Sequence, residues 1–171
     1  MRRTYAILLT IIAVPILAFM AWRNQAPSWD GSPLVIEQKA ESPLEILFFG
    51  DNGSGLPEQF KVSEAMERYC LTHHLAAVFM LGDNFYPQGV KTIDDAQWQN
   101  KFRDPYEKPC LGQIPFYAIL GNHDYKGRPE AQIAYSHEQK FWHMPHRFYS
   151  VQFGDLAKII AIDTNIPDLC G

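Results

Sequence analysis

Three short apolar runs along the chain each stop at a glycine that is followed by polar residues. These runs cover residues 46–49, 76–81 and 116–120 and contain aromatic and branched aliphatic side chains. Short apolar runs bounded in this way are typical of strands buried in a parallel sheet. Between the first two runs, apolar side chains recur with helical spacing from about Pro57 to His74, with a proline in the first turn. The pattern therefore predicts a strand, a crossover helix and a second strand parallel to the first.

The same alternation of strand and helix patterns continues toward the end of the chain. Four further elements are expected: helices around residues 94–102 and 129–135, and strands over residues 148–153 and 158–163. A turn at Gly154-Asp155 joins the last two strands. The pattern predicts one α/β domain over residues 44–171, built on a βαβαβ sheet with flanking helices.

The N-terminal segment differs from everything after it. An almost uninterrupted apolar run from Tyr5 to Trp22 follows a basic N-terminus. Its length of about 18 residues lies at the lower limit for a membrane-spanning helix and exceeds the usual signal-peptide core of ~7 to 15 residues. A buried core helix is a less favoured alternative on length. We expect residues 1–23 to be a signal anchor or signal peptide, and its cleavage is left open.

Residues 24–43 are rich in Pro, Ser, Gln and charged side chains, as linkers are. With the basic N-terminus held inside, the domain after this linker would face the exported side of a membrane, periplasmic or extracellular. We expect it to be membrane-anchored or secreted. In an oxidising compartment, the odd number of cysteines leaves at least one of Cys70, Cys110 and Cys170 without a partner in this chain. Their pairing stays open at this point.

The overall composition is that of a globular protein. Hydrophobic residues make up 47% and charged residues 20% of the chain, so one folded core is expected. The formal net charge is -4, and the lysines and arginines are scattered apart from a pair at the N-terminus. Because nucleic-acid binding needs a basic patch, we expect no nucleic-acid partner.

Acidic and amide residues fill the loops that follow the three apolar runs. The loops are Gly50-Asp51-Asn52-Gly53, Gly82-Asp83-Asn84-Phe85-Tyr86 and Gly121-Asn122-His123-Asp124. Taken singly, such a loop is more often a turn in which aspartate caps the backbone. The carboxyl ends of parallel strands meet at one edge of a sheet, however, which would bring Asp51 and Asp83 together. Crowded carboxylates without a basic partner favour a bound cation, and these donors suit iron, zinc or manganese.

The loops resemble those of the calcineurin-like metallophosphoesterase superfamily and, within it, the purple acid phosphatases of the small tartrate-resistant type. The resemblance runs from about residue 44 to residue 171. The wider superfamily opens with Asp-x-His, whereas this chain has Asp51-Asn52-Gly53 and places Tyr86 three residues after Asp83, as the purple enzymes do. Further similarity lies in residues 131–136, 163–164 and 169–171. The resemblance implies one half of a four-layer α/β-β/α sandwich.

The resemblance also implies roles for five loop residues. Asp51 and Tyr86 would bind a ferric ion, and Asp83 would bridge two ions. Asn122 would bind the second ion, a divalent iron, zinc or manganese. His123 would be the catalytic side chain beside the phosphate of a phosphomonoester substrate, where it orients the phosphate or protonates the leaving alcohol. The implied activity is that of an acid phosphatase in which the dinuclear metal centre activates a hydroxide.

Two later histidine motifs of the family have no match in this chain. Because these motifs supply three metal ligands, we expect the chain to represent the N-terminal half of the fold, with weak or no activity by itself. The apolar faces of residues 76–81 and 158–163 would then lie partly exposed, which favours self-association. Two alternatives remain: a non-catalytic metal-binding or interaction remnant of the fold, and a phosphodiesterase or nucleotide hydrolase of the wider superfamily, which Tyr86 disfavours.

Overall fold

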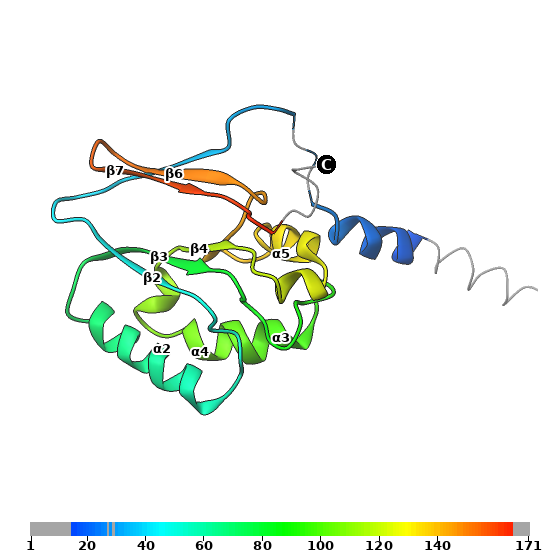
Figure 1. The fold of residues 1–171 in the computed structure, drawn as a ribbon, viewed down its shortest axis with the longest axis horizontal. Helices are drawn as coiled ribbons and strands as arrows, with labels where there is room; N and C mark the ends of the chain where they lie inside the picture. Colours follow the sequence, from blue (N-terminus) through cyan, green and yellow to red (C-terminus); the bar gives the residue numbers. More distant parts are fainter. Residues whose placement is uncertain (1–14, 27, 29, 166–171) are drawn as a thin grey trace, which may run out of the picture.

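Two sheets form the framework of the protein (Figure 1). The computed structural model describes residues 15–26, 28 and 30–165. One sheet is parallel throughout in the order β2-β3-β4-β5, and the other has the order β1-β6-β7. The strands are β1 (Val35–Gln38), β2 (Glu45–Phe49), β3 (Leu75–Leu81), β4 (Phe116–Ile119), β5 (Trp142–His143), β6 (Tyr149–Phe153) and β7 (Ala157–Ala161). The helical elements are α2 (Pro57–Cys70), α3 (Ala96–Trp98), the π-helix η1 (Gln99–Arg103), α4 (Asp104–Tyr106), the 3-10 helices η2 (Leu111–Gln113) and η3 (Asp124–Lys126), and α5 (Pro129–Tyr135).

The parallel sheet lies between a layer of helices and the three-stranded sheet (Figure 1). On the helical side, Phe49 of β2 meets Tyr106 of α4 edge-on, with 5.6 Å between ring centroids. On the other side, the hydroxyl of Tyr149 in β6 donates a 2.8 Å hydrogen bond to the carbonyl oxygen of Ala118 in β4. Both faces of the central strands are covered, as parallel sheets require. The predicted α/β class with a parallel βαβαβ sheet is confirmed.

An aromatic cluster fills the core between the helices and the parallel sheet. Trp98, Phe102 and Tyr106 project from the continuous helical stretch α3-η1-α4 and are almost completely buried. Trp98 stacks on Tyr135 of α5 and meets Trp142 of β5 nearly at right angles. Burial of these rings explains why the helical stretch continues to Tyr106, beyond its predicted end near residue 102.

Helix α2 begins at Pro57, as a proline in the first turn predicts, and ends at Cys70, earlier than expected. Cys70 forms a disulfide with Cys110, with 5.9 Å between the Cα atoms. Beside the disulfide, the Glu67 carboxylate accepts hydrogen bonds from the backbone N–H of Cys110 and of the residue after it. These contacts fix the segment before β4 to the end of α2. The third cysteine, Cys170, lies outside the described residues.

The predicted strands are all present, with ends within two residues of those expected. Two strands were not predicted. β1 lies within the 24–43 segment that was expected to be a linker, and it pairs in parallel with β6. β5 is short and pairs with β4 through Trp142 and His143. Neither strand carries an apolar run in the sequence. Each forms by backbone pairing with a neighbouring strand, β1 with β6 and β5 with β4.

The expected exposure of two strands is confirmed in part for the first and fully for the second. Residues 76–81 are partly exposed only at their two ends, because Ala76 is half-buried and Leu81 is 50% exposed, whereas the four residues between them are buried. Sheet β1-β6-β7 covers this strand, and Phe79 of β3 packs against Phe153 of β6. In contrast, Ile160 of the edge strand β7 is 69% exposed, which confirms the prediction for residues 158–163. Self-association through that strand stays a prediction.

Residues 15–23 form a helix that leaves the domain beside α5 (Figure 1). Within the described ranges, no helix is both long enough and apolar enough to cross a membrane. The first part of the predicted anchor, residues 1–14, lies outside the described residues. Export and anchoring in a membrane therefore stay predictions.

Candidate metal centre

Glycines allow the three loops to pack against one another at the carboxyl edge of the parallel sheet. A Cβ atom on Gly53 would lie 1.9 Å from the carbonyl oxygen of Asn84. One on Gly121 would lie 2.3 Å from the backbone nitrogen of Asp83. Only glycine permits such close backbone approaches. The backbone N–H of Tyr86 donates to the carbonyl oxygen of Gly53 at 2.8 Å. The loops after β2, β3 and β4 therefore form one packed unit.

The aspartates that follow β2 and β3 share an uncommon backbone conformation. Asp51 and Asp83 have φ angles of 55° and 52°, in the left-handed region. This conformation costs an L-residue roughly 1–2 kcal/mol, although aspartate tolerates it better than most residues. Such strain is found more often at functional sites than elsewhere, because the surrounding packing must maintain it. Here it occurs at corresponding positions of two adjacent strands.

Three oxygen atoms converge where these aspartates meet Tyr86. The hydroxyl oxygen of Tyr86 lies 2.7 Å from Oδ1 of Asp51 and 2.6 Å from Oδ2 of Asp83. A phenol has one hydrogen, which cannot lie fully on both lines. The phenol alone therefore cannot place a proton within both close pairs of oxygen atoms. Two carboxylates and a phenol held this close suit a hard cation, so the side chains fit the ferric half of the predicted centre.

The neighbouring carboxylates act on the ionisation of Tyr86. They and burial raise the pKa of its hydroxyl well above the ordinary value, with the hydrogen bond to Asp83 as the largest cause, followed by burial and the hydrogen bond to Asp51. Without a cation, the phenol therefore keeps its proton. A bound cation has the opposite effect, because positive charge favours the tyrosinate. If Tyr86 binds a metal ion, coordination would therefore be coupled to the release of a proton.

Asp83 lies at the centre of the cluster and is only 7% exposed. While its Oδ2 accepts from Tyr86, its Oδ1 accepts from the backbone N–H of His123 at 2.9 Å. Both carboxylate oxygens are held in place by neighbouring loops. This arrangement suits the bridging role that the sequence predicted, and the role itself stays a prediction.

The ring of His123 lies beside Tyr86, with 4.4 Å between ring centroids. Its Nδ1 lies 2.8 Å from the carbonyl oxygen of Pro87. Because a carbonyl oxygen can only accept, Nδ1 carries the hydrogen and Nε2 is the nitrogen that can take up a proton. The Lys126 ammonium lies 3.4 Å from Nε2. The structure therefore places a proton-carrying group and a positive charge at the rim of the cluster.

Asn122 is on the same loop, but its side chain is exposed. Among the described residues, no hydrogen bond joins its amide to the aspartates or the tyrosine of the cluster. The described part of the chain also contains no group of three or more His, Cys, Asp or Glu side chains that could hold a metal ion. The predicted donors for the divalent ion are thus limited to Asp83 and Asn122.

A buried polar network supports the loops, and sequence reasoning did not assign it a function. The fully buried Asp124 carboxylate accepts from the backbone N–H groups of Gly121 at 2.9 Å and Asn84 at 3.1 Å. Its other oxygen accepts from Nε2 of Gln132 at 2.9 Å. Burial raises the pKa of Asp124, although these hydrogen bonds oppose the shift. The only sequence signal for Asp124 and Gln132 was that both lie in segments that resemble the family.

Known proteins resemble this chain over the region that contains the loops. The family model for "Calcineurin-like phosphoesterase" matches residues 44–171. Tartrate-resistant acid phosphatase type 5 from Homo sapiens is 43% identical over 76 residues, or 44% of this chain and 23% of that protein. The Mus musculus protein of the same name is 34% identical over 129 residues, or 71% of this chain and 39% of that protein. Purple acid phosphatase 4 from Arabidopsis thaliana is 38% identical over 128 residues, or 74% of this chain and 34% of that protein.

The matched region therefore spans less than half of the length of these relatives. Among solved structures, one described as "GAP50 the anchor in the inner membrane complex of Plasmodium" superimposes with a TM-score of 0.61. It is 24% identical and covers 72% of this chain and 44% of that chain. At this level of identity the likeness concerns the fold alone.

Proposed function

Because the chain belongs to the calcineurin-like phosphoesterase family, we propose that it carries the site of a purple-type acid phosphatase acting on phosphate monoesters. The observation that carries this proposal is the convergence of Asp51, Asp83 and Tyr86 within hydrogen-bonding distance. A tyrosine in this position, without an Asp-x-His motif, separates the purple type from the phosphodiesterases of the wider superfamily. The relatives that are named as acid phosphatases support the same choice.

Four side chains would hold the metal ions of this site. Asp51 and Tyr86 would supply oxygen donors for a ferric ion, and Asp83 would supply donors to both ions. Asn122 would turn toward a divalent iron, zinc or manganese ion. When bound, the two ions would polarise the phosphoryl oxygens and lower the pKa of a water molecule toward ~7.

His123 would move a proton during the reaction. Its Nδ1–H is committed to the carbonyl oxygen of Pro87, so Nε2 is the atom that holds the mobile proton. From Nε2 the proton can pass to the oxygen of the leaving alcohol. The nearby Lys126 ammonium, 3.4 Å from Nε2, also attracts the phosphate electrostatically.

A non-catalytic metal-binding module is the second candidate function. It is favoured by one observation, the exposed position of Asn122, which leaves few donors for a second ion. The number of bound ions separates the candidates, because the enzyme needs two ions per site and the module needs one or none. Because the donors for the divalent ion among the described residues are limited to Asp83 and Asn122, we expect the chain by itself to show weak or no activity.

Reconstitution of the full chain with ferric and divalent ions tests the proposal. Two bound metals with a broad visible band from tyrosinate-to-iron charge transfer would support the site, and p-nitrophenyl phosphate then measures turnover. Tyr86→Phe should abolish the band. Tyr69→Phe, which removes an exposed hydroxyl on α2, should leave it unchanged. A colourless protein with at most one ion would favour the module, and a band that survives Tyr86→Phe would contradict the ligand assignment.

A further inference from the structure

The helix of residues 15–23 exposes large apolar side chains on all sides. Its exposed residues are Ile16, Leu17, Phe19, Met20 and Trp22, with exposed fractions between 49% and 68%. Every residue from 15 to 22 is apolar. A helix that is apolar all round needs an environment that covers it on every side. The described part of the domain does not provide this cover.

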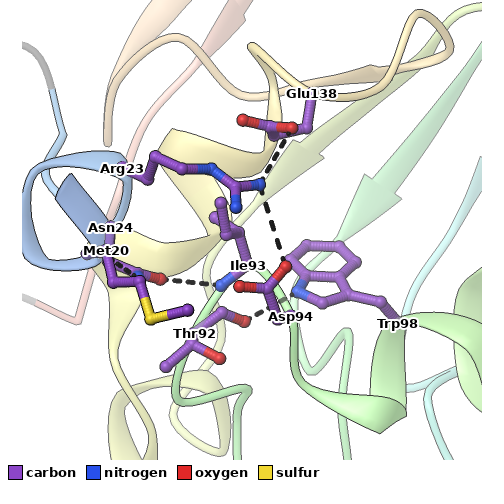
Figure 2. Close-up of polar contacts among 8 residues, drawn as sticks. All are labelled: Met20, Arg23, Asn24, Thr92, Ile93, Asp94, Trp98 and Glu138. Carbon is purple, nitrogen blue, oxygen red and sulfur yellow. Dashed lines mark hydrogen bonds and ion pairs between the residues drawn. The ribbon is translucent and has the colours of Figure 1, made fainter. Parts of the chain in front are cut away.

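One buried side chain attaches the end of this helix to the domain (Figure 2). Asn24 is 8% exposed, and its Nδ2 donates to the carbonyl oxygen of Met20 at 2.7 Å. Its Oδ1 accepts from the backbone N–H of Ile93 at 2.8 Å. The same amide therefore caps the helix and satisfies a buried donor in the loop before α3. A flexible linker would not hold an asparagine in this way.

Ion pairs add two further points of attachment (Figure 2). The Arg23 guanidinium lies 3.2 Å from the Glu138 carboxylate, just after α5, and 3.8 Å from the Asp94 carboxylate. The loop that bears Asp94 is itself held, because the indole N–H of Trp98 donates to the carbonyl oxygen of Thr92 at 3.1 Å. Arg23 and Asn24 thus bind two separate elements of the domain, and this pair is called the lock below.

A lipid bilayer is the partner that fits the helix. In the sequence, the apolar run continues toward the N-terminus as far as Tyr5 and begins after a basic pair. A protein groove would cover one face of such a segment, whereas hydrocarbon covers all of them. The basic N-terminus complements anionic headgroups. The polar lock at residues 23 and 24 then marks where the apolar surface ends.

We propose that the lock holds the apolar helix rigidly on the domain, so that insertion of the helix into a lipid bilayer fixes the orientation of the domain. The loop that receives Asn24 at Ile93 also carries Asp83 and Tyr86 of the candidate metal centre, ten and seven residues earlier in the sequence. Fixing this loop fixes the direction in which the centre faces. The proposal does not rest on phosphatase activity.

Distances between two spin labels in the full chain test the lock. One label replaces Leu17 in the helix and the other replaces Lys61, an exposed residue of α2. A Cys170→Ser background leaves the Cys70–Cys110 disulfide intact. In vesicles of phosphatidylcholine and phosphatidylglycerol, we expect the chain to float with the lipid and to give one narrow distance distribution.

Removal of the lock should broaden that distribution. In Asn24→Ala, the residues between the helix and β1 would become a flexible tether with a root-mean-square reach of roughly 18 Å. Asn100→Ala makes the same chemical change at an exposed position of η1 and should leave the distribution narrow. Arg23→Glu should also broaden it, and the added change Glu138→Arg should narrow it again by restoring an ion pair.

Each outcome bears on the proposal. A chain that does not float with vesicles would overturn the bilayer as partner. A broad distribution for the unaltered chain, or equal widths for Asn24→Ala and Asn100→Ala, would overturn the lock. If Asn24→Ala does not fold, the charge-exchange pair decides, and an Arg23→Glu variant as narrow as the unaltered chain would refute the proposal. None of these results depends on iron binding or hydrolysis.

Discussion

Replacing Asp124 by asparagine should destabilise the protein although the side chain keeps its shape. In the unaltered protein, each side-chain amide of the buried network around Asp124 points its nitrogen at an oxygen. Nδ2 of Asn84 donates to the carbonyl oxygen of Ile119 and to Oε1 of Gln132, and Nε2 of Gln132 donates to Asp124. An asparagine at position 124 must keep its oxygen for the two backbone N–H groups. It therefore presents its amide nitrogen to the amide nitrogen of Gln132.

No rearrangement of the amides removes this mismatch. Turning the Gln132 amide moves the donor–donor contact to Asn84. Turning the Asn84 amide then places its oxygen against the carbonyl oxygen of Ile119, which is an acceptor–acceptor contact. One mismatched buried pair costs about 1–3 kcal/mol, and the backbone donors also lose a charged acceptor. We expect Asp124→Asn to lower the free energy of unfolding by about 3 kcal/mol.

A second substitution should reverse the effect. In Asp124→Asn with Gln132→Glu, the glutamate accepts from Asn84 through one oxygen and from the new asparagine through the other. Every donor then faces an acceptor, and the network has the same total charge as before. Gln132→Glu alone should be strongly destabilising, because it buries two carboxylates side by side. The double variant should therefore be more stable than either single variant.

Urea unfolding of the full chain, followed by tryptophan fluorescence, gives these free energies. Asp155→Asn, in the exposed turn after β6, is the matched control and should change stability by less than about 0.5 kcal/mol. The reasoning is refuted if Asp124→Asn is as stable as Asp155→Asn. It is equally refuted if the double variant is no more stable than Gln132→Glu, because the direction of the amides would then not matter.

Three further predictions concern the disulfide and the candidate metal centre. Cys70 and Cys110 are 40 positions apart in the sequence. Replacing both by serine should lower the free energy of unfolding by about 4 kcal/mol, which is the contribution of loop-closure entropy for that separation. An unchanged urea midpoint would contradict this. Gly121→Ala should abolish the visible iron band, because its Cβ would lie 2.3 Å from Oδ1 of Asp83. Gly112→Ala, whose Cβ meets its nearest neighbour at 3.4 Å, should preserve the band. Because the pKa of Tyr86 is raised, its phenol is protonated in the cation-free protein at neutral pH and loses that proton on coordination. Around neutral pH, ferric affinity should therefore rise about tenfold per pH unit. An equal slope for Tyr86→Phe would argue against coordination by the phenol.

The fold was predictable where the sequence carries a long pattern. β2, β3 and β4 are apolar runs, and their order follows from the crossover between them. β1 was not predictable, because the sequence Val35–Gln38 has no such run and joins the sheet only by pairing with β6. β5 contributes only Trp142 and His143 to the ladder. Both strands exist because a neighbouring strand leaves backbone groups to pair, which a local pattern does not reveal.

The residues of the candidate site also divide into those that a local sequence pattern reveals and those that depend on backbone groups left to pair after folding. The meeting of Asp51 and Asp83 could be predicted, because parallel strands deliver their carboxyl ends to one edge and residue type indicates the chemistry. The role of Asp124 could not, because it depends on which N–H groups of Gly121 and Asn84 remain unpaired after the loops pack. Asn24 is a parallel case, since its neighbours in the sequence are typical of a linker and its partner is the N–H of Ile93. Ligand candidates can therefore be found from residue type and spacing, whereas positioning residues are defined by the backbone groups that the fold leaves without partners.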